Sequence, residues 1–240
     1  MSIAVLGGFE LCIDNEPVGI PLSSERVLAF IALNSRAAVP RALIAGTLWP
    51  DAPASCAHAN LRSALSRLRD TGKQALDIGA SEVRLARDAV IDFQHARSLA
   101  QHILDATQHG ELEDLVDPGI GTIDALAADL LPGWYDDWAQ LEAERWRQLR
   151  LHALETLSET FTAAGRYAEA VAAARTAVHA DPLRESSWVC LVRAHVAEGN
   201  PSEALHDFGD YVQRLGSELG LYPTARLCAL VAEVYAAASH

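Results

Sequence analysis

The sequence contains almost no lysine and no closely spaced cysteines. Lys73 is the single lysine, so arginine supplies the other 18 of the 19 basic residues. The four cysteines form no CxxC pair, which excludes a zinc site or disulfide framework built on such pairs, and we expect buried thiols in a reducing compartment. No run approaches the roughly 18 apolar residues of a membrane span, and no basic segment precedes the first apolar stretch. We therefore expect a cytoplasmic chain with no membrane partner.

The motifs of common catalytic sites are also missing from the sequence. The nine histidines are scattered, and we find no Ser/His/Asp or Cys/His order, no HExxH motif and no Gly-rich phosphate loop. We expect no enzymatic activity, no cofactor and no metal. Histidines such as His195 are expected to pack in the interior or to face solvent.

Basic charge is scarce overall but unevenly distributed. The net charge of −13 argues against nucleic acid as a partner, because phosphate binding requires basic surface. Residues 1–92 hold nine basic and ten acidic residues, a net charge of −1, whereas residues 93–240 hold ten and 22, a net charge of −12. Within 62–73, four basic residues accompany one acid, which gives a local charge of +3. A DNA site is expected in this segment.

The length of 240 residues favours two domains, which we divide into 1–92 and 93–240. Apolar and polar residues alternate around Leu11 and are followed by turn residues, which predicts a short antiparallel sheet. Ser23 or Ser24 is expected to cap a first helix. Pro40 suits the start of a second helix, which should end at Trp49 because a proline follows it.

A third helix is predicted from about residue 55 to residue 69. Leu61, Leu65 and Leu68 recur at helical spacing and form its inward stripe. Small and basic residues occupy the outer surface, where they can approach base edges and phosphates. These outward residues are Asn60, Arg62, Ser63, Ser66, Arg67 and Arg69. The alternative interpretation is an ordinary solvated helix face.

Residues 74–78 and 82–86 alternate on either side of a glycine turn and predict a β-hairpin directly after this helix. Lys73, just before the hairpin, and Arg84 and Arg87 in and after it complete the predicted DNA-binding set. A sheet, three helices and a hairpin follow each other in the order of a winged helix-turn-helix.

The second half of the chain contains an internal repeat. The segment 165–170 recurs as 199–204, an offset of 34 residues, which is the period of a tetratricopeptide repeat of paired helices. A further helix over 227–238 is predicted to cap the stack, with Leu227, Leu230, Val231 and Val234 inward.

The region between the two predicted domains is harder to assign. Trp138 and Trp146 stand at helical spacing and are expected in the core, whereas Trp134 and Tyr135 follow a Pro-Gly turn and are expected to be partly exposed. Residues 105–129 have weak periodicity and many acids, so we expect a loop there.

Several stretches together carry a resemblance to a known family. They are VLGGFEL, PLSSERVLAFIAL, LWPDAPA ahead of LRSALSRLR, EVRLARDAVIDF, LLPGWYDDW, RQLRLHALE, DPLRESSW and AEGNPSEAL with LGLYP. The sequence resembles activators of the Streptomyces antibiotic regulatory protein type, which carry a bacterial transcriptional activation domain.

The resemblance implies an α+β fold for residues 1–92, a winged helix-turn-helix of the response-regulator type, followed by an all-α, tetratricopeptide-like domain. It implies contacts to promoter DNA by Asn60 and the other outward residues of the third helix. It also implies that the chain is a nucleoid-associated activator of a kind that binds direct repeats in double-stranded DNA as pairs of identical chains. These recruit RNA polymerase holoenzyme to genes of secondary metabolism.

The main alternative is a protein-binding adaptor, in which the repeat domain binds other proteins and the winged helix has lost its affinity for DNA. The net charge of −13 favours this alternative. A salt titration separates the two hypotheses, because true phosphate contacts give a log-linear loss of affinity with salt.

Overall fold

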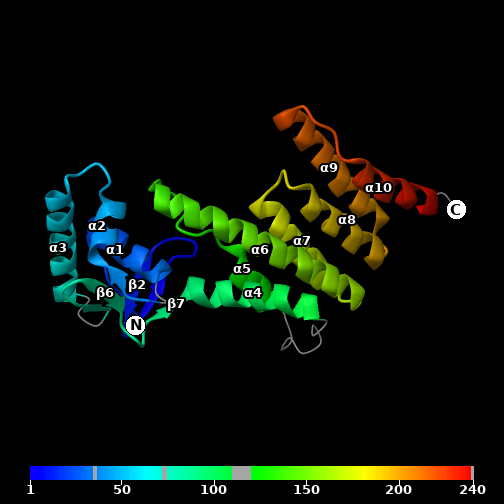
Figure 1. Cartoon of the computed structure of the whole chain (residues 1–240). Helices are drawn as coiled ribbons and strands as arrows, with labels where there is room; N and C mark the ends of the chain where they lie inside the picture. Colours follow the sequence, from blue (N-terminus) through cyan, green and yellow to red (C-terminus); the bar gives the residue numbers. More distant parts are fainter. Residues whose placement is uncertain (35–36, 72–74, 110–119, 239–240) are drawn as a thin grey trace. The chain divides into compact units, whose positions relative to one another are not determined.

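The computed structural model describes residues 1–34, 37–71, 75–109 and 120–238 (Figure 1). The fold is mostly helical, with small sheets near the N-terminus. Two compact units are present: unit 1 is Met1–Ala96 with Asp129–Trp146, and unit 2 is Arg97–Ala128 with Arg147–His240. Residues 129–146 thus group with unit 1, which the predicted domain boundary after residue 92 did not anticipate. That domain boundary stays a prediction.

Unit 1 contains short strands in two sheets, β3-β2-β1-β7 and β4-β6-β5. The strands are β1 (Ser2–Ala4), β2 (Glu10–Ile13), β3 (Glu16–Pro17), β4 (Val39–Pro40), β5 (Leu76–Ile78), β6 (Glu82–Leu85) and β7 (Val90–Ile91). Both predicted antiparallel hairpins are present, β2–β3 and β5–β6. The first turns at Asp14 and Asn15, whose positive φ of 52° and 65° these residue types tolerate. The parallel pairing of β7 with β1 was not predicted.

Three helices complete the N-terminal part of unit 1: α1 (Leu22–Leu33), α2 (Arg41–Leu48) and α3 (Ala54–Thr71). The expected cap of α1 by Ser23 or Ser24 is wrong. The helix follows Pro21, and no side chain caps it. Ser24 is instead fully buried, and its Oγ donates a hydrogen bond to the carbonyl oxygen of Ala64 in α3 (3.0 Å). The hydroxyl that could have capped α1 therefore joins two helices.

Residues 129–146 return to the N-terminal strand region. The amide of Gly7 donates to the carbonyl of Asp129 (2.7 Å), and the amide of Leu131 donates to the carbonyl of Val5 (2.8 Å). A bridge pairs Leu6 with Leu130 between these two bonds. Backbone pairing thus fixes the start of this segment within unit 1.

The aromatic residues of this segment largely follow the prediction. Trp146 is buried with its ring edge-on to Phe93, and Trp134 is partly exposed. Tyr135 is 84% exposed, which is more than the partial exposure we expected. Trp138 is only partly buried, so its prediction as a core residue holds in part.

Unit 2 is helical. Its helices are α4 (Asp92–His109) and α6 (Asp137–Ala163), both of which begin in unit 1, and α5 (Ile120–Ala127), α7 (Tyr167–Ala180), α8 (Glu185–Glu198), α9 (Pro201–Leu219) and α10 (Ala225–Ala238). The expectation of a loop over 105–129 is wrong where the structure describes this region, because 105–109 lie in α4 and 120–127 in α5. Ile123 and Leu126, three residues apart, are buried on one face of α5. The acid-rich stretch 110–119 lies outside the described residues.

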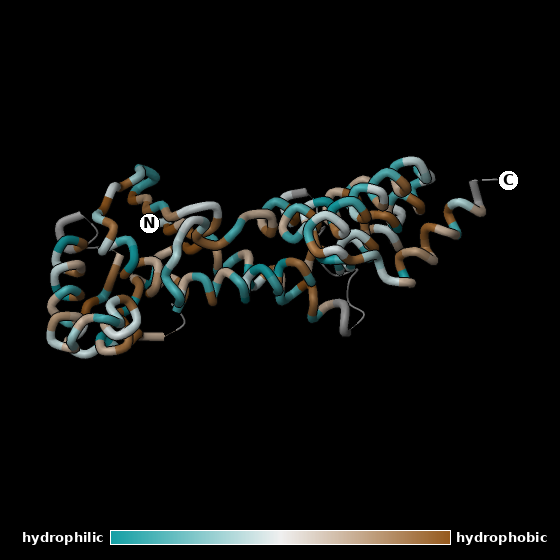
Figure 2. The backbone as a smooth tube through the Cα atoms, turned by 90° about the horizontal axis from the view of Figure 1, so that it is seen from above, coloured by the Kyte–Doolittle hydropathy of each residue, from teal (hydrophilic) through white to brown (hydrophobic). Residues whose placement is uncertain are grey.

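The 34-residue offset has a counterpart in the backbone. Gly165 and Gly199 both have positive φ, 73° and 88°, in the turns that follow α6 and α8. Glycine adopts this left-handed conformation without steric cost. Trp188 of α8 is buried beside Tyr211 of α9, with ring centroids 5.4 Å apart. Figure 2 shows hydrophobic and hydrophilic stretches following one another along the helices of unit 2.

Two further predictions concern α10 and the thiols. Leu227, Val231 and Val234 are buried as predicted, and Leu230 is partly buried. The expectation of buried thiols holds for Cys190 alone, since Cys12 is partly exposed and the other two cysteines, Cys56 and Cys228, are exposed.

Within the described residues, the structure contains no helix with both the length and the apolar character that a membrane crossing requires.

Candidate nucleic-acid interface

Helix α3 presents one apolar face and one polar face. Leu61, Leu65 and Leu68 are buried, as are Ala57 and Ala64, and this face packs against α1 and α2. The predicted inward stripe is therefore present. Figure 1 shows α3 at the outside of unit 1, with α1 and α2 on its inner side.

The residues predicted to face DNA lie together on the outer face of α3. All five of those whose side chains are described are exposed: Asn60, Arg62, Ser63, Ser66 and Arg67. At a rise of about 1.5 Å per residue, they span about 10 Å, which is close to the width of the major groove. The side chain of Arg69 and the whole of Lys73 lie outside the described residues.

The two described arginines of this face differ in their contacts. Arg67 Nη1 lies 3.4 Å from the Oγ of Ser23 in the first turn of α1 and donates a hydrogen bond to it. In the described part of the chain, Arg62 makes no hydrogen bond or ion pair. Arg62 is therefore available to a ligand, whereas Ser23 orients Arg67. Sequence reasoning treated Ser23 as a cap and missed this role.

Arg41 connects the start of α2 to the turn of the hairpin β5–β6. Its backbone amide donates to the carbonyl of Ser81 (2.9 Å), and its Nη1 donates to the carbonyl of Gly79 (3.2 Å). A Cβ at Gly79 would lie 3.2 Å from the carbonyl oxygen of Glu82, so glycine fits this turn best. These contacts join α2 to the hairpin, the Ser24–Ala64 hydrogen bond joins α1 to α3, and α3 packs on both α1 and α2.

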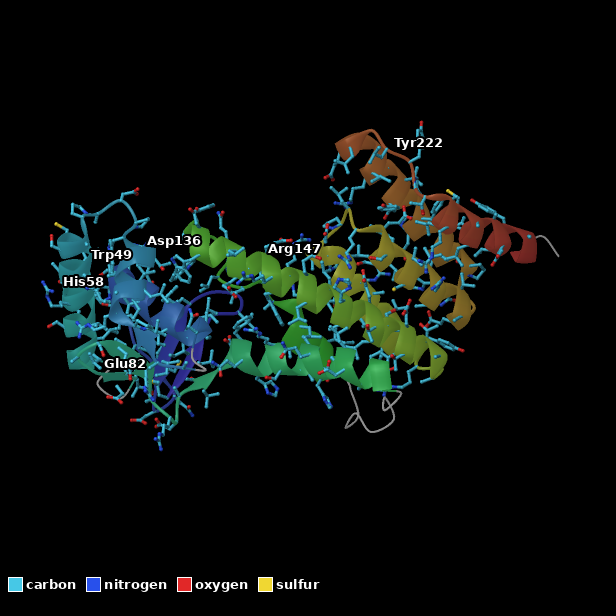
Figure 3. All side chains as sticks on the ribbon, in the orientation of Figure 1. Trp49, His58, Glu82, Asp136, Arg147 and Tyr222 are labelled. Carbon is cyan, nitrogen blue, oxygen red and sulfur yellow. The ribbon has the colours of Figure 1, made fainter. Side chains whose placement is uncertain are left out.

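Of the three basic contacts predicted after α3, the structure describes Arg84 and Arg87. Both are exposed, and Arg84 pairs with a carboxylate. Arg84 Nε and Nη2 lie 3.3 and 2.7 Å from the same Oε1 of Glu82. The hydrogen bond to Glu82 is the main reason why the pKa of Arg84 is raised above its ordinary value. Arg87 lies beyond the strand and next to Asp88. Figure 3 labels Glu82 on this hairpin and His58 on α3.

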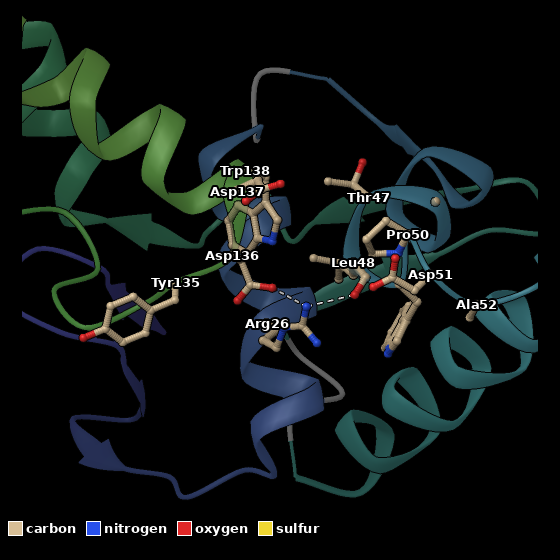
Figure 4. Close-up of a pocket in the computed structure, with 12 residues that line it drawn as sticks. Arg26, Thr47, Leu48, Pro50, Asp51, Ala52, Tyr135, Asp136, Asp137 and Trp138 are labelled. Atoms are coloured by element: carbon tan, nitrogen blue, oxygen red, sulfur yellow. Dashed lines mark hydrogen bonds and ion pairs between the residues drawn. The ribbon is translucent and has the colours of Figure 1, made fainter.

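Unit 1 also contains a cavity of about 690 Å³ beside the turn between α2 and α3 (Figure 4). The Arg26 guanidinium at its edge pairs with Asp136 and donates a hydrogen bond to the carbonyl of Leu48 (2.8 Å). This network ties α1, the end of α2 and the start of α6 together. No sequence pattern predicts this network, because Arg26 and Asp136 are 110 residues apart in the chain.

Comparison with protein families gives a match over residues 88–235 to the bacterial transcriptional activator domain. The chain belongs to this family. The resemblance to the Streptomyces antibiotic regulatory proteins, drawn from the sequence, is confirmed by this match and by two relatives named as regulatory proteins of Streptomyces.

Two relatives and one solved structure illustrate the similarity. The regulatory protein AfsR of Streptomyces coelicolor is 30% identical over 93% of this chain, which spans 23% of the length of AfsR. The regulatory protein DnrI of Streptomyces peucetius is 27% identical over 84% of this chain and 79% of its own length. The fold is similar to that of EmbR of Mycobacterium tuberculosis, solved with a low-affinity phosphopeptide. The TM-score is 0.72 at 22% identity, over 98% of this chain and 64% of EmbR.

Proposed function

We propose that this chain is a sequence-specific DNA-binding activator of transcription that places α3 in the major groove. The observation that carries the proposal is the outer face of α3, where Asn60, Arg62, Ser63, Ser66 and Arg67 are all exposed beside each other. No acidic residue occurs in 54–69. Arginine can bind guanine through two hydrogen bonds and asparagine can bind adenine, while short serines allow a close approach.

The order of elements in unit 1 supports a winged helix-turn-helix of the response-regulator type. In this interpretation α3 is the recognition helix and the hairpin β5–β6 is the wing. The contacts to the DNA backbone, which position the protein without selecting a sequence, are then made by Arg69, Lys73, Arg84 and Arg87.

Residues 93–240 are the part that we assign to protein partners, as a tetratricopeptide-like activation domain. Their net charge of −12 opposes contact with phosphates, so this part should bind protein rather than DNA. Following the family resemblance, we propose RNA polymerase holoenzyme as the partner and direct repeats in promoters of secondary-metabolite genes as the target. Pairs of identical chains would bind side by side there. A protein with this function acts on nucleoid DNA in the cytoplasm and needs no catalytic site.

The test measures fluorescence anisotropy of the full chain on promoter DNA selected from its own genome and on scrambled DNA. Affinity should fall log-linearly with salt. Arg62→Ala and Arg67→Ala should each weaken binding to promoter DNA by about 1–3 kcal/mol, or about 5- to 150-fold. Arg214→Ala, which removes an exposed arginine from α9, is the matched control and should have little effect. Equal affinity in all four proteins would refute the assignment of α3.

The adaptor hypothesis remains the second candidate. The net charge of −13 and the carboxylate on Arg84 favour it, because both reduce the basic surface that phosphates require. Under this hypothesis the full chain shows no salt-dependent DNA binding, and the α3 variants behave like the wild-type protein.

A further inference from the structure

The wing arginine Arg84 lies between two carboxylates. Strand β6 buries Val83 and directs the residues on either side of it, Glu82 and Arg84, to the opposite face. Asp77 of β5 is the cross-strand neighbour of Arg84 in the hairpin register. The side chains of Arg84 and Glu82 are 57% and 43% exposed, so this pair faces solvent rather than the core. The outer face of the hairpin therefore presents two acids and one base.

The hydrogen bonds to Glu82 use donors that a DNA phosphate would need. A guanidinium binds carboxylates and phosphates with the same planar arrangement of N–H groups. Arg84 already directs both Nε and Nη2 to one oxygen of Glu82. A phosphate that approached these atoms would have to displace a carboxylate of the same charge sign. Exposed ion pairs are weak, so such an exchange is open to competition.

We propose that Glu82 limits the affinity of this protein for DNA, because its carboxylate competes with backbone phosphates for the guanidinium of Arg84. The inference rests on the proposed function. Phosphate contacts carry no sequence information, so Glu82 lowers affinity for all DNA alike and leaves the choice of sequence to α3.

The test uses the full chain and the variant Glu82→Gln. Freeing Arg84 for one phosphate should steepen the slope of log affinity against log salt by about 0.9. Between 0.05 and 0.2 M salt, the variant should then lose about 3.5-fold more affinity than the wild-type protein. At 0.05 M it should bind promoter and scrambled DNA more tightly. In an Arg84→Ala background, the same substitution should leave the slope unchanged.

Glu16→Gln is the matched control, because it removes the same charge from an exposed position on β3. Glu82→Ala serves as a second variant, and far-UV circular dichroism verifies that each protein is folded. The inference is overturned if Glu82→Gln has the slope of Glu16→Gln, if its effect persists without Arg84, or if it weakens binding.

The binding data distinguish a failure of this inference from a failure of the proposed function. If Arg62→Ala weakens binding while Glu82→Gln leaves the slope unchanged, only the role of Glu82 is refuted. If the wild-type protein, Arg62→Ala and Glu82→Gln all lack salt-dependent binding, the proposed function fails and this inference fails with it.

Discussion

Replacing Trp138 by alanine should destabilise unit 1, the part of the molecule that carries α3. The Trp138 ring lies edge-on against Phe30 of α1, with centroids 5.3 Å apart and an interplanar angle of 89°. A second edge-on contact joins it to Trp134 at 6.0 Å. The segment 129–146 therefore packs directly on the first helix of the predicted DNA-binding domain.

The size of the effect follows from these contacts. An aromatic pair contributes about 0.5–1.5 kcal/mol beyond its buried area, and truncating a fully buried tryptophan costs about 3–5 kcal/mol. Trp138 makes two such pairs but is only partly buried. We therefore expect Trp138→Ala to lower the free energy of unfolding of unit 1 by about 2–4 kcal/mol.

Hydrogen exchange of the α1 amides in the full chain measures this loss locally. A loss of 2 kcal/mol corresponds to about 30-fold faster exchange through opening, since about 1.4 kcal/mol is a factor of ten. Tyr135→Ala is the control, because Tyr135 is aromatic, adjacent in sequence and 84% exposed. Equal exchange of α1 in the two variants would refute the packing argument. A fragment of residues 1–92 lacks Trp138 altogether, so DNA-binding experiments are better made with the full chain.

Two other predictions concern unit 2 and the thiols. Burial favours a higher pKa for Glu155, but hydrogen bonds from Arg184 and two serine hydroxyls, with the charge of Arg184, bring the pKa below its ordinary value. A carboxyl whose pKa is lowered by folding stabilises the fold at pH values above its unfolded pKa of about 4.3. This stabilisation is lost as the pH falls through the pKa of the folded state. Urea unfolding should show Glu155→Gln less stable than wild type near pH 6, with a difference that shrinks below pH 4; a constant difference contradicts this. Burial raises the pKa of Cys190 to about 12, so Ellman's reagent should react quickly with Cys56 and Cys228 and with Cys190 only after unfolding.

The sequence predicted features that depend on local periodicity. The inward stripe of α3 repeats at helical spacing, so the same count that places Leu61 and Leu65 inside places Arg62 and Ser66 outside. The hairpin after α3 and the turns near Gly165 and Gly199 also have local signals, in alternation and in a fixed offset. For these elements, residues close together in the sequence determine the conformation.

Contacts between distant segments could not be predicted in this way. The Ser24 hydroxyl bonds to Ala64 rather than capping α1, because tertiary packing buries it against α3. Arg26 and Asp136 meet because residues 129–146 return to unit 1, and a single sequence carries no signal of that return. Helix α5 was missed for a different reason, since the neighbouring acidic stretch obscured a short apolar stripe.

The sequence also gives the number of charges but not their contacts, and the DNA-binding hypothesis depends on which charges are unpaired. Counting residues places two arginines in and just after the hairpin, but Arg84 already has Glu82 on its strand and Asp77 across from it. By contrast, residues 54–69 of α3 contain no acid, and Arg62 has no ion-pair partner within the described residues. Phosphates respond to the local field rather than to the number of arginines. The basic surface available to DNA is therefore concentrated on α3, and affinity should respond more to changes there than to the loss of Arg84.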